Sequence, residues 1–204
     1  MSIEFLITAL IVVLAPGTGV VYTLATGLAQ GRMASVAAAF GCTLGIIPAI
    51  LASVFGIAAL FHTSALLFQT VKFAGVAYLL YLAWQTLKDR GAMRVSGEGV
   101  ERRNLFQIAR NGFLINILNP KLSIFFLAFL PQFVSPAAAS PVLEMLAMSA
   151  VFMAMTFAVF VVYGQFSGLM RDRVLSSERA IAWMRRSVAL AFAGFGLKLA
   201  LSSR

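Results

Sequence analysis

The chain has 204 residues, of which 61% are hydrophobic and 11% charged, with a net charge of +9 and a mean hydropathy of +0.93. A soluble domain carries about 25% charged and roughly 45–50% apolar residues, so this composition excludes an ordinary soluble domain and indicates a chain covered by lipid. The basic residues lie between apolar runs and not along one helical face, so we expect no nucleic-acid partner.

Long unbroken apolar runs predict membrane-spanning helices. A bilayer core of about 30 Å needs about 20 apolar residues per helix, and backbone groups in lipid must find partners within the chain. The alternating ten-residue segments of a transmembrane barrel are not present. We therefore predict an all-α integral membrane protein. The six candidate spans are 3–27, 35–60, 65–87, 108–134, 143–169 and 181–201.

The first and sixth spans need separate arguments. The first has no basic residue before it and a long apolar run, unlike a signal peptide, so we interpret it as a retained helix. The sixth begins with Arg185 and Arg186, which leave about 15 apolar residues, or roughly 22 Å of helix. It spans only if these arginines and Lys198 reach opposite headgroup regions. Five spans are the alternative.

Basic residues alternate between the links. Lysine and arginine are concentrated in the segment 88–104 and in the links before spans two and six, whereas the links 61–64 and 131–142 contain none. The positive-inside rule then places the basic loops in the cytoplasm. With six spans, both termini lie on the periplasmic side.

This topology exposes an internal repeat. Halves of about 1–90 and 104–204, joined by the basic loop 88–104, would enter the membrane from opposite sides, and each opens with a proline-broken helix. Inverted repeats with discontinuous helices are typical of secondary transporters. We therefore predict one transmembrane transporter domain, a 3+3 inverted repeat in which helices 1 and 4 are broken. A purely structural kink is the alternative interpretation of each break.

The first break, at Pro16, Gly17 and Thr18, is a candidate part of the substrate pathway. Proline removes a backbone donor and displaces the carbonyl one turn earlier, and Thr18 can bond a freed carbonyl. Half-helix ends present dipoles that suit the carboxylate or ammonium group of an amino acid. We expect this segment to face the bundle interior.

The second candidate part is the densest polar cluster inside any span, formed by Asn116, Asn119 and Lys121 around Pro120. At helical spacing Asn116, Asn119 and Pro120 lie on neighbouring faces. A lysine at this depth is energetically expensive and therefore typical of a functional site. It could meet a substrate carboxylate or the C-terminal end of a helix.

Small residues at four-residue spacing allow helices to approach closely. We expect packing at these positions, either within one chain or in a homodimer, and we expect the single cysteine to be a small packing residue. The residues at this spacing are Ala37, Gly41 and Gly45, and Gly164 and Gly168; the cysteine is Cys42.

The sequence contains no recognisable catalytic constellation. Paired membrane aspartates, an HExxH motif and a serine with a nearby histidine are all missing, and His62 is the one histidine of the chain. We therefore expect no enzyme activity, no metal and no cofactor. A passive channel or a structural membrane subunit is the alternative to a transporter, because helix breaks also line pores.

Six short motifs are spread along the chain. They are Ala15-Pro16-Gly17, Gly27…Gly31-Arg32, Gly75-Val76-Ala77-Tyr78-Leu79, Asn116-Ile117-Leu118-Asn119-Pro120-Lys121, Phe125-Phe126 and Leu130-Pro131-Gln132-Phe133. Through these motifs the chain resembles, over essentially its whole length, the lysine exporter/homoserine–threonine resistance (LysE/RhtB) family. The resemblance implies six helices in inverted repeats and proton-driven, secondary active efflux of amino acids or related metabolites across the bacterial inner membrane.

The chain departs from this family at the first break. Members usually continue with Pro-Gly-Pro and then Asn or Asp, whereas Thr18 and Gly19 stand here. The break therefore lacks a side chain that could contact substrate or carry a proton. The acidic residues near the spans, Glu4 and Glu144, lie close to an outer edge, so a neutral amino acid or small metabolite is favoured over a cationic one.

Overall fold

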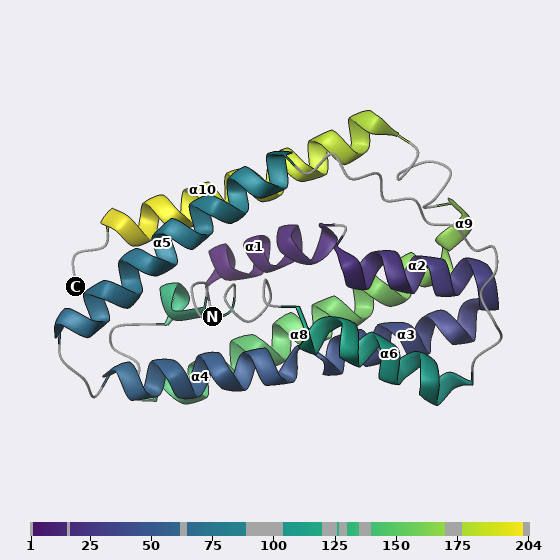
Figure 1. Ribbon diagram of the computed structural model, residues 1–204, viewed down its shortest axis with the longest axis horizontal. Helices are drawn as coiled ribbons and strands as arrows, with labels where there is room; N and C mark the ends of the chain where they lie inside the picture. The colour runs from purple at the N-terminus through teal and green to yellow at the C-terminus, as the bar shows by residue number, and fades with distance from the viewer. Residues whose placement is uncertain are drawn as a thin grey trace.

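The computed structural model describes residues 2–15, 17–61, 65–88, 104–119, 126, 130–134, 140–169 and 177–201. Within these ranges all regular secondary structure is helical, and most helices run roughly along one long axis (Figure 1). This confirms the all-α prediction. The elements are α1 (Ile3–Leu14), α2 (Thr18–Gln30), α3 (Arg32–Leu44), α4 (Ile47–Phe61), α5 (Ala65–Lys88), α6 (Leu105–Ile117), the short 3-10 helix η1 (Leu130–Phe133), α8 (Pro141–Gln165), α9 (Ser167–Leu169) and α10 (Glu178–Leu201).

Local capping residues determine where several helices begin. The side chain of Ser2 accepts a hydrogen bond from the amide of Phe5 at 3.2 Å and starts α1. A capping box of Asn104 and Gln107 starts α6. Ser140 caps α8, whose first residue is a proline. Each cap satisfies amide groups that have no partner inside the helix.

Two stretches of the described chain are long and apolar enough to cross a bilayer. They are Arg32–Gly56, which contains α3 and most of α4, and α8, each of 25 residues, with mean hydropathies of 2.0 and 2.3. The bent pair of α1 and α2 makes a third if it counts as one span. These helices support a multi-pass membrane protein, while the full set of six spans stays a prediction.

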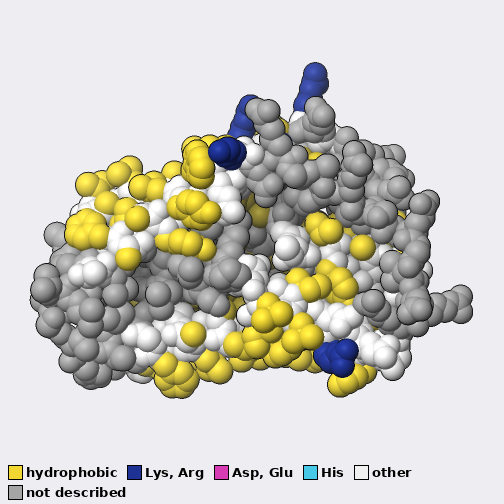
Figure 2. Space-filling model, viewed as in Figure 1, with side chains coloured by type: hydrophobic (Ala, Val, Ile, Leu, Met, Phe, Trp, Pro, Cys, Tyr) yellow, Lys and Arg dark blue, Asp and Glu magenta, His cyan; other side chains and the backbone are white. Residues whose placement is uncertain are grey.

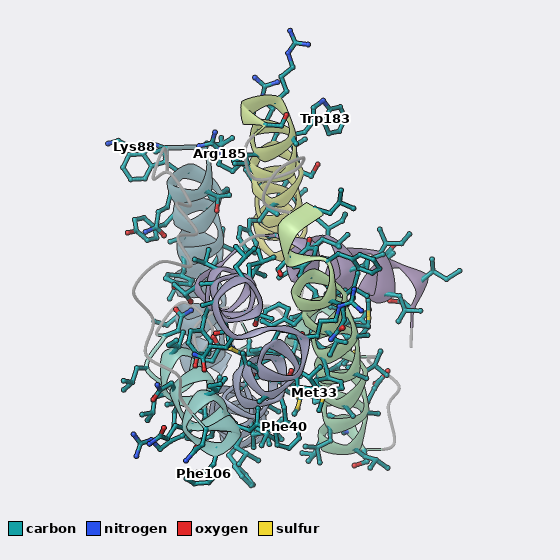
Figure 3. All side chains as sticks on the ribbon, turned by 90° about the vertical axis from the view of Figure 1, so that its right-hand side faces the viewer. Met33, Phe40, Lys88, Phe106, Trp183 and Arg185 are labelled. Atoms are coloured by element: carbon teal, nitrogen blue, oxygen red, sulfur yellow. The ribbon has the colours of Figure 1, made fainter. Side chains whose placement is uncertain are left out.

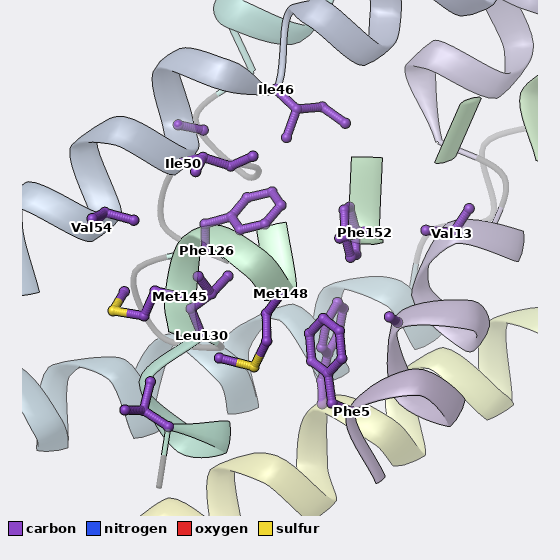
Figure 4. Close-up of a cluster of buried hydrophobic side chains, with 14 of the residues drawn as sticks. Phe5, Val13, Ile46, Ile50, Val54, Phe126, Leu130, Met145, Met148 and Phe152 are labelled. Carbon is purple, nitrogen blue, oxygen red and sulfur yellow. The ribbon is translucent and has the colours of Figure 1, made fainter. Parts of the chain in front are cut away.

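The largest buried cluster joins α1, α4, α8 and α10 around the residues near η1. Figure 4 shows Phe126 beside Phe152, with Met148 between these rings and Phe5. The ring of Phe5 lies farther away and meets that of Phe133, with centroids 5.5 Å apart. The rings of Phe126 and Phe152 are edge to face with centroids 5.0 Å apart. This packing and the hydrogen bond from the Ser53 hydroxyl to the Phe126 carbonyl at 2.9 Å hold Phe126 in the bundle.

Glycines set the close contact of α3 with α6. A Cβ added to Gly41 would overlap the carbonyl oxygen of Ala109, and one on Gly45 would lie 2.6 Å from the Phe113 oxygen. On α8, a Cβ on Gly164 would lie 2.5 Å from the Cβ of Ser35. The packing prediction is confirmed at these three glycines, and the contacts lie within one chain. Ala37 is half-buried, and the surroundings of Gly168 lie outside the described residues.

The outer surface is apolar, as lipid contact requires. Figure 2 shows hydrophobic side chains spread over the visible face, with Lys and Arg at its edges. Ile7 on α1, Phe55 on α4 and Leu190 on α10 are all more than half exposed, and Figure 3 shows Phe40 and Phe106 directed outward. In water such a surface would cause aggregation, whereas in a bilayer it is in contact with the lipid acyl chains.

The Gly41 contact yields a testable prediction. Gly41→Ala places a methyl group against backbone that cannot rotate away, so the free energy of unfolding should fall by about 1–3 kcal/mol, which lowers Tm by roughly 2–4 °C per kcal/mol. The measurement is a thermal melt of the purified protein in detergent. Gly194→Ala is the control because its Cβ would meet nothing within 4 Å. Equal Tm values for the two variants would contradict the close contact.

Candidate functional site

The first predicted break is present. α1 ends at Leu14, α2 begins at Thr18, and the two helices meet at a bend of 52°. The amide of Ala15 donates to the carbonyl of Val12, three residues earlier, at 3.2 Å, and this tighter turn ends α1. The backbone of Gly17 is extended, with φ −111°. Pro16 lies outside the described residues.

A side chain from α8 satisfies one of the carbonyls that this break leaves without a helical partner. In an unbroken helix the Leu14 oxygen would accept from the amide of residue 18. Here it accepts from the hydroxyl of Tyr163 at 2.8 Å. Nothing in the sequence indicated Tyr163, because 149 residues separate it from Leu14.

A second interruption, between α3 and α4, was missed by the sequence interpretation. The amide of Ile46 donates to the Thr43 carbonyl at 3.1 Å. In a regular α-helix it would donate to the carbonyl of Cys42. The Cys42 oxygen instead accepts from Nδ2 of Asn116 at 2.6 Å. The signal was Gly45 followed by Pro48, since Pro48 has no amide to continue the ladder.

The break predicted for the fourth span falls where α6 ends. Its last residue is Ile117, and the amide of Asn119 closes a turn onto the Asn116 carbonyl at 3.1 Å. Pro120 and Lys121, the other two predicted residues of this cluster, lie outside the described residues. The position of the helix end agrees with the prediction, and the continuation of the chain adds only Phe126 and the residues of η1.

Asn116 lies between α3 and the start of α2. Its side chain is buried, with 5% of its surface exposed, and its nitrogen is committed to the Cys42 carbonyl. Its Oδ1 lies 3.4 Å from the position that a Cβ on Gly19 would occupy, and we find no hydrogen bond to this oxygen among the described residues. Asn116 therefore presents an acceptor toward the start of α2.

The first turn of α2 only partly faces the interior. Gly17 and Thr18 are exposed, contrary to the expectation that the segment points into the bundle, whereas Gly19 is buried. No side chain caps the amides of this turn. A helix N-terminus with uncapped amides attracts negative charge, so the exposed turn can receive a carboxylate.

Gly19 is surrounded on its buried side. A Cβ there would lie 2.9 Å from the ring of Phe160 on α8. The Gly19 carbonyl accepts from the hydroxyl of Thr23 at 2.9 Å, and the Sγ of Cys42 lies 4.0 Å from it. Cys42 is fully buried, which confirms its packing role. We call Gly19, Thr23, Cys42, Asn116 and Phe160 the junction cluster.

The junction cluster lies at interrupted helices. Figure 1 shows the ends of α1, α3 and α6 all near the middle of the long axis. The acidic residues of the described ranges, Glu4, Glu144 and Glu178, stand at the starts of α1, α8 and α10 and not at this cluster. No group of His, Cys, Asp and Glu in the described part of the chain could hold a metal. The cluster offers uncapped amides, one amide oxygen and an aromatic wall.

The Asn116 bond yields a testable prediction. Asn116→Ala leaves the Cys42 carbonyl without its side-chain donor, which should lower the free energy of unfolding by about 1–3 kcal/mol. Asn116→Asp should be at least as harmful, because a carboxylate oxygen would face the carbonyl oxygen. The control is Asn111→Ala, a half-buried asparagine of the same helix with no side-chain hydrogen bond among the described residues. Detergent melts indistinguishable between Asn116→Ala and the control would refute the role of this bond.

Comparison with known proteins agrees with this architecture. The chain is 32% identical to an uncharacterized membrane protein of Pseudomonas aeruginosa, over 98% of this chain and 94% of that protein. It is 26% identical to a leucine efflux protein of an Enterobacter species, over 96% and 93%. It is 34% identical to a homoserine/homoserine lactone efflux protein of Salmonella typhimurium, over 65% and 64%.

No solved structure matches the chain. The family comparison covers nearly all of it, since residues 10–203 match the LysE type translocator family. This agrees with the resemblance seen in the sequence motifs and with a multi-pass membrane protein. The chain belongs to the LysE type translocator family.

Proposed function

We propose that this chain exports an amino acid or a similar small metabolite, by secondary active transport driven by the proton gradient across the bacterial inner membrane. The structural observation that carries the proposal is the junction cluster, where the start of α2 meets the end of α6 (Figure 1). Family membership and the efflux proteins among the relatives support it. Broken helices meeting within a bundle are the usual place for a transported solute.

The two charged ends of an amino acid find complementary groups at this junction. The uncapped amides of Gly17, Thr18 and Gly19 suit the carboxylate, and Oδ1 of Asn116 suits the ammonium group. Pro16 and Pro120 would interrupt the helices that present these groups. Asn119 and Lys121 extend the pathway beyond α6.

The side-chain end of the substrate is expected to be neutral. Phe160 occupies the volume in which a side chain on residue 19 would lie, and the described carboxylates lie away from the junction. A cationic side chain would lose its hydration there without a counter-charge in return. An aliphatic or small polar amino acid fits this environment.

The helix pairings support a single domain built as a 3+3 inverted repeat, with halves of about 1–90 and 104–204. α5 and α10, the third helices of the two halves, pack along each other. The contact of α3 with α6 has its counterpart in the contacts of α1 and α2 with α8. If the two halves were exchanged, the pair of α3 and α6 would become the pair of α8 with α1 and α2, and the pair of α5 and α10 would become itself.

The same arrangement supports the proposed topology. In Figure 1 the end of α4, the start of α5 and the end of α10 lie toward one end of the molecule. The end of α2 and the starts of α3 and α6 lie toward the other. The end of α5 lies between these two ends of the molecule. The alternation of the other helix ends supports six spans with the basic loops cytoplasmic and both termini periplasmic.

The export proposal is tested by feeding dipeptides to cells with and without this protein. Hydrolysis raises one amino acid inside the cell, and an exporter should lower its internal level while the external level rises in proportion. Collapse of the proton gradient should abolish the difference. Intracellular and external amino-acid concentrations are the measurement, across a panel that includes leucine, homoserine and lysine.

Two variants accompany this assay. Lys121→Ala should abolish export with normal membrane expression, whereas Arg110→Ala, an exposed charge on α6, should leave export unchanged. Flux that is neither saturable nor dependent on the gradient would favour a passive channel. No difference across the panel would favour a structural subunit.

The Gly19–Phe160 contact yields a further prediction. Gly19→Asn forces its side chain against the ring, so export should fall and stability should drop by about 1–3 kcal/mol. Adding Phe160→Ala should recover part of both losses, with a coupling energy of about 0.5–3 kcal/mol. Phe157→Ala is the matched control, since Phe157 lies on the same helix but packs against Phe40. Equal recovery by both phenylalanine variants would contradict the direct contact.

A further inference from the structure

Two facing rows of residues line the contact of α2 with α8 and α9. They are Gly19, Thr23 and Gly27 on α2, Phe160 and Gly164 on α8, and Ser167 on α9. Residues three or four apart share one side of a helix, so each row runs lengthwise along the contact, which we call the seam. Its inner end lies at the junction cluster. Figure 1 shows its outer end, beside α9, toward the end of the molecule where α2 ends and α3 and α6 begin.

The seam is closed by direct contact, because most of its residues are small. A Cβ on Gly27 would lie 2.9 Å from the Gly164 oxygen and 3.0 Å from the Oγ of Ser167. A Cβ on Gly164 would lie 3.2 Å from the methyl group of Thr23 and 2.5 Å from the Oγ of Ser35, which approaches from α3. The outer part of the seam can therefore open without a large side chain changing its rotamer.

Buried polar atoms mark both ends of the seam. At the outer end Ser167 is 7% exposed, and its hydroxyl forms no hydrogen bond with any residue that the structure describes. At the inner end the Oδ1 of Asn116 is in the same situation. Between them lies the fully buried Thr23. Buried polar atoms are normally paired, so two unpaired atoms along one contact indicate that the seam meets a polar partner when it is open.

On one side of the seam, α2, α3 and α6 are tied together as one body. The hydroxyl of Tyr22 on α2 donates to the Ile108 carbonyl of α6 at 2.9 Å, and Asn116 ties α6 to α3 through the Cys42 carbonyl. Each helix of this body also has an end at an interruption: α2 starts after the first break, α3 stops at the second interruption, and α6 ends at Ile117. Hinges lie at such helix ends, so the body can tilt without bending any of its helices.

One side-chain hydrogen bond fastens the outer end of the seam. The Nε2 of Gln165, the last residue of α8, donates to the carbonyl of Arg32, the first residue of α3, at 3.3 Å. Gln165 is half-buried and Arg32 is exposed, and this end faces water in the proposed topology. Water can therefore replace Gln165 as the donor when the body tilts, so the bond stabilises the closed seam without preventing its opening.

We propose that the seam is the route by which the transported solute reaches the junction cluster from the cytoplasm, and that it opens when α2, α3 and α6 tilt away from α8 and α9. The hydroxyls of Thr23, Ser35 and Ser167 then line the route and form hydrogen bonds with the solute and its water. This lining suits a small polar or zwitterionic solute better than an apolar one. The inference deepens the proposed function and rests on it, since an exporter must be loaded from the cytoplasm.

Cys42 provides the measurement. It is the single cysteine of the chain, and it is fully buried at the inner end of the seam, with its Sγ 4.0 Å from the Gly19 carbonyl oxygen. The full chain in membrane vesicles is treated with a membrane-impermeant maleimide, which alkylates an exposed thiol. Because the seam opens toward the cytoplasm, Cys42 should be labelled faster in inside-out than in right-side-out vesicles. No labelling from the cytoplasmic side, or faster labelling from the periplasmic side, would overturn the proposal.

The bond across the seam supplies a variant with a matched control. Gln165→Leu should speed the labelling of Cys42 about two- to tenfold, the range expected from losing one ordinary hydrogen bond. The control is Gln107→Leu, because the Asn104 amide donates to the Oε1 of Gln107 at the same distance of 3.3 Å, at the same end of the molecule but outside the seam. The control should be labelled at the rate of the unchanged protein. Equal rates for the two variants would refute the route.

A second variant acts on the seam by volume. Gly27→Ala pushes α2 away from Gly164 and Ser167, so it too should speed labelling, whereas Gly194→Ala, whose Cβ would meet nothing within 4 Å, should not. Detergent melts establish that each variant is folded, and Gln165→Leu decides if Gly27→Ala is not. Labelling that responds to these variants without any export would refute the proposed function and leave the opening of the seam in place. Export with labelling that responds to neither variant would refute the route alone.

Discussion

The structure depends on satisfying backbone carbonyls at interrupted helices where no water is available. Each interruption removes the amide that a carbonyl one turn earlier would have used, and such a group is costly in lipid. Tyr163 donates to the Leu14 carbonyl, and Asn116 donates to that of Cys42. The buried hydroxyl of Ser53 donates to the carbonyl of Phe126 and so anchors that residue to α4. Side chains from other helices thus hold the broken segments in place.

Close helix packing makes these bonds geometrically available. Asn116 reaches the Cys42 carbonyl because α3 and α6 approach through Gly41 and Gly112, where any Cβ would collide with the facing helix. The polar bonds therefore depend on the small residues. Glycines bring the backbones together, and the short distance lets a side chain on one helix replace a missing amide on the other.

The hydrogen bond of Asn116 also determines which of its atoms faces the proposed substrate site. The nitrogen of Asn116 has a structural role, which leaves its oxygen facing the start of α2. Gly19, which replaces the polar residue usual in the family, is explained by the Phe160 ring that fills the space beside it. Function and stability thus share residues at the junction, because a transport pathway must pass where the helices are already interrupted.

The sequence by itself determined the helical membrane class, the outer limits of most long helices, the break near Pro16 and the end of a helix near Asn119. These follow from hydropathy and proline chemistry, which act over a few residues. Only the tertiary structure decided which groups satisfy the breaks and why residue 19 is a glycine. Those contacts join residues far apart in the chain, with separations of 149 for Tyr163–Leu14 and 74 for Asn116–Cys42. Local patterns carry no information about such distant partners, because close packing of whole helices selects them.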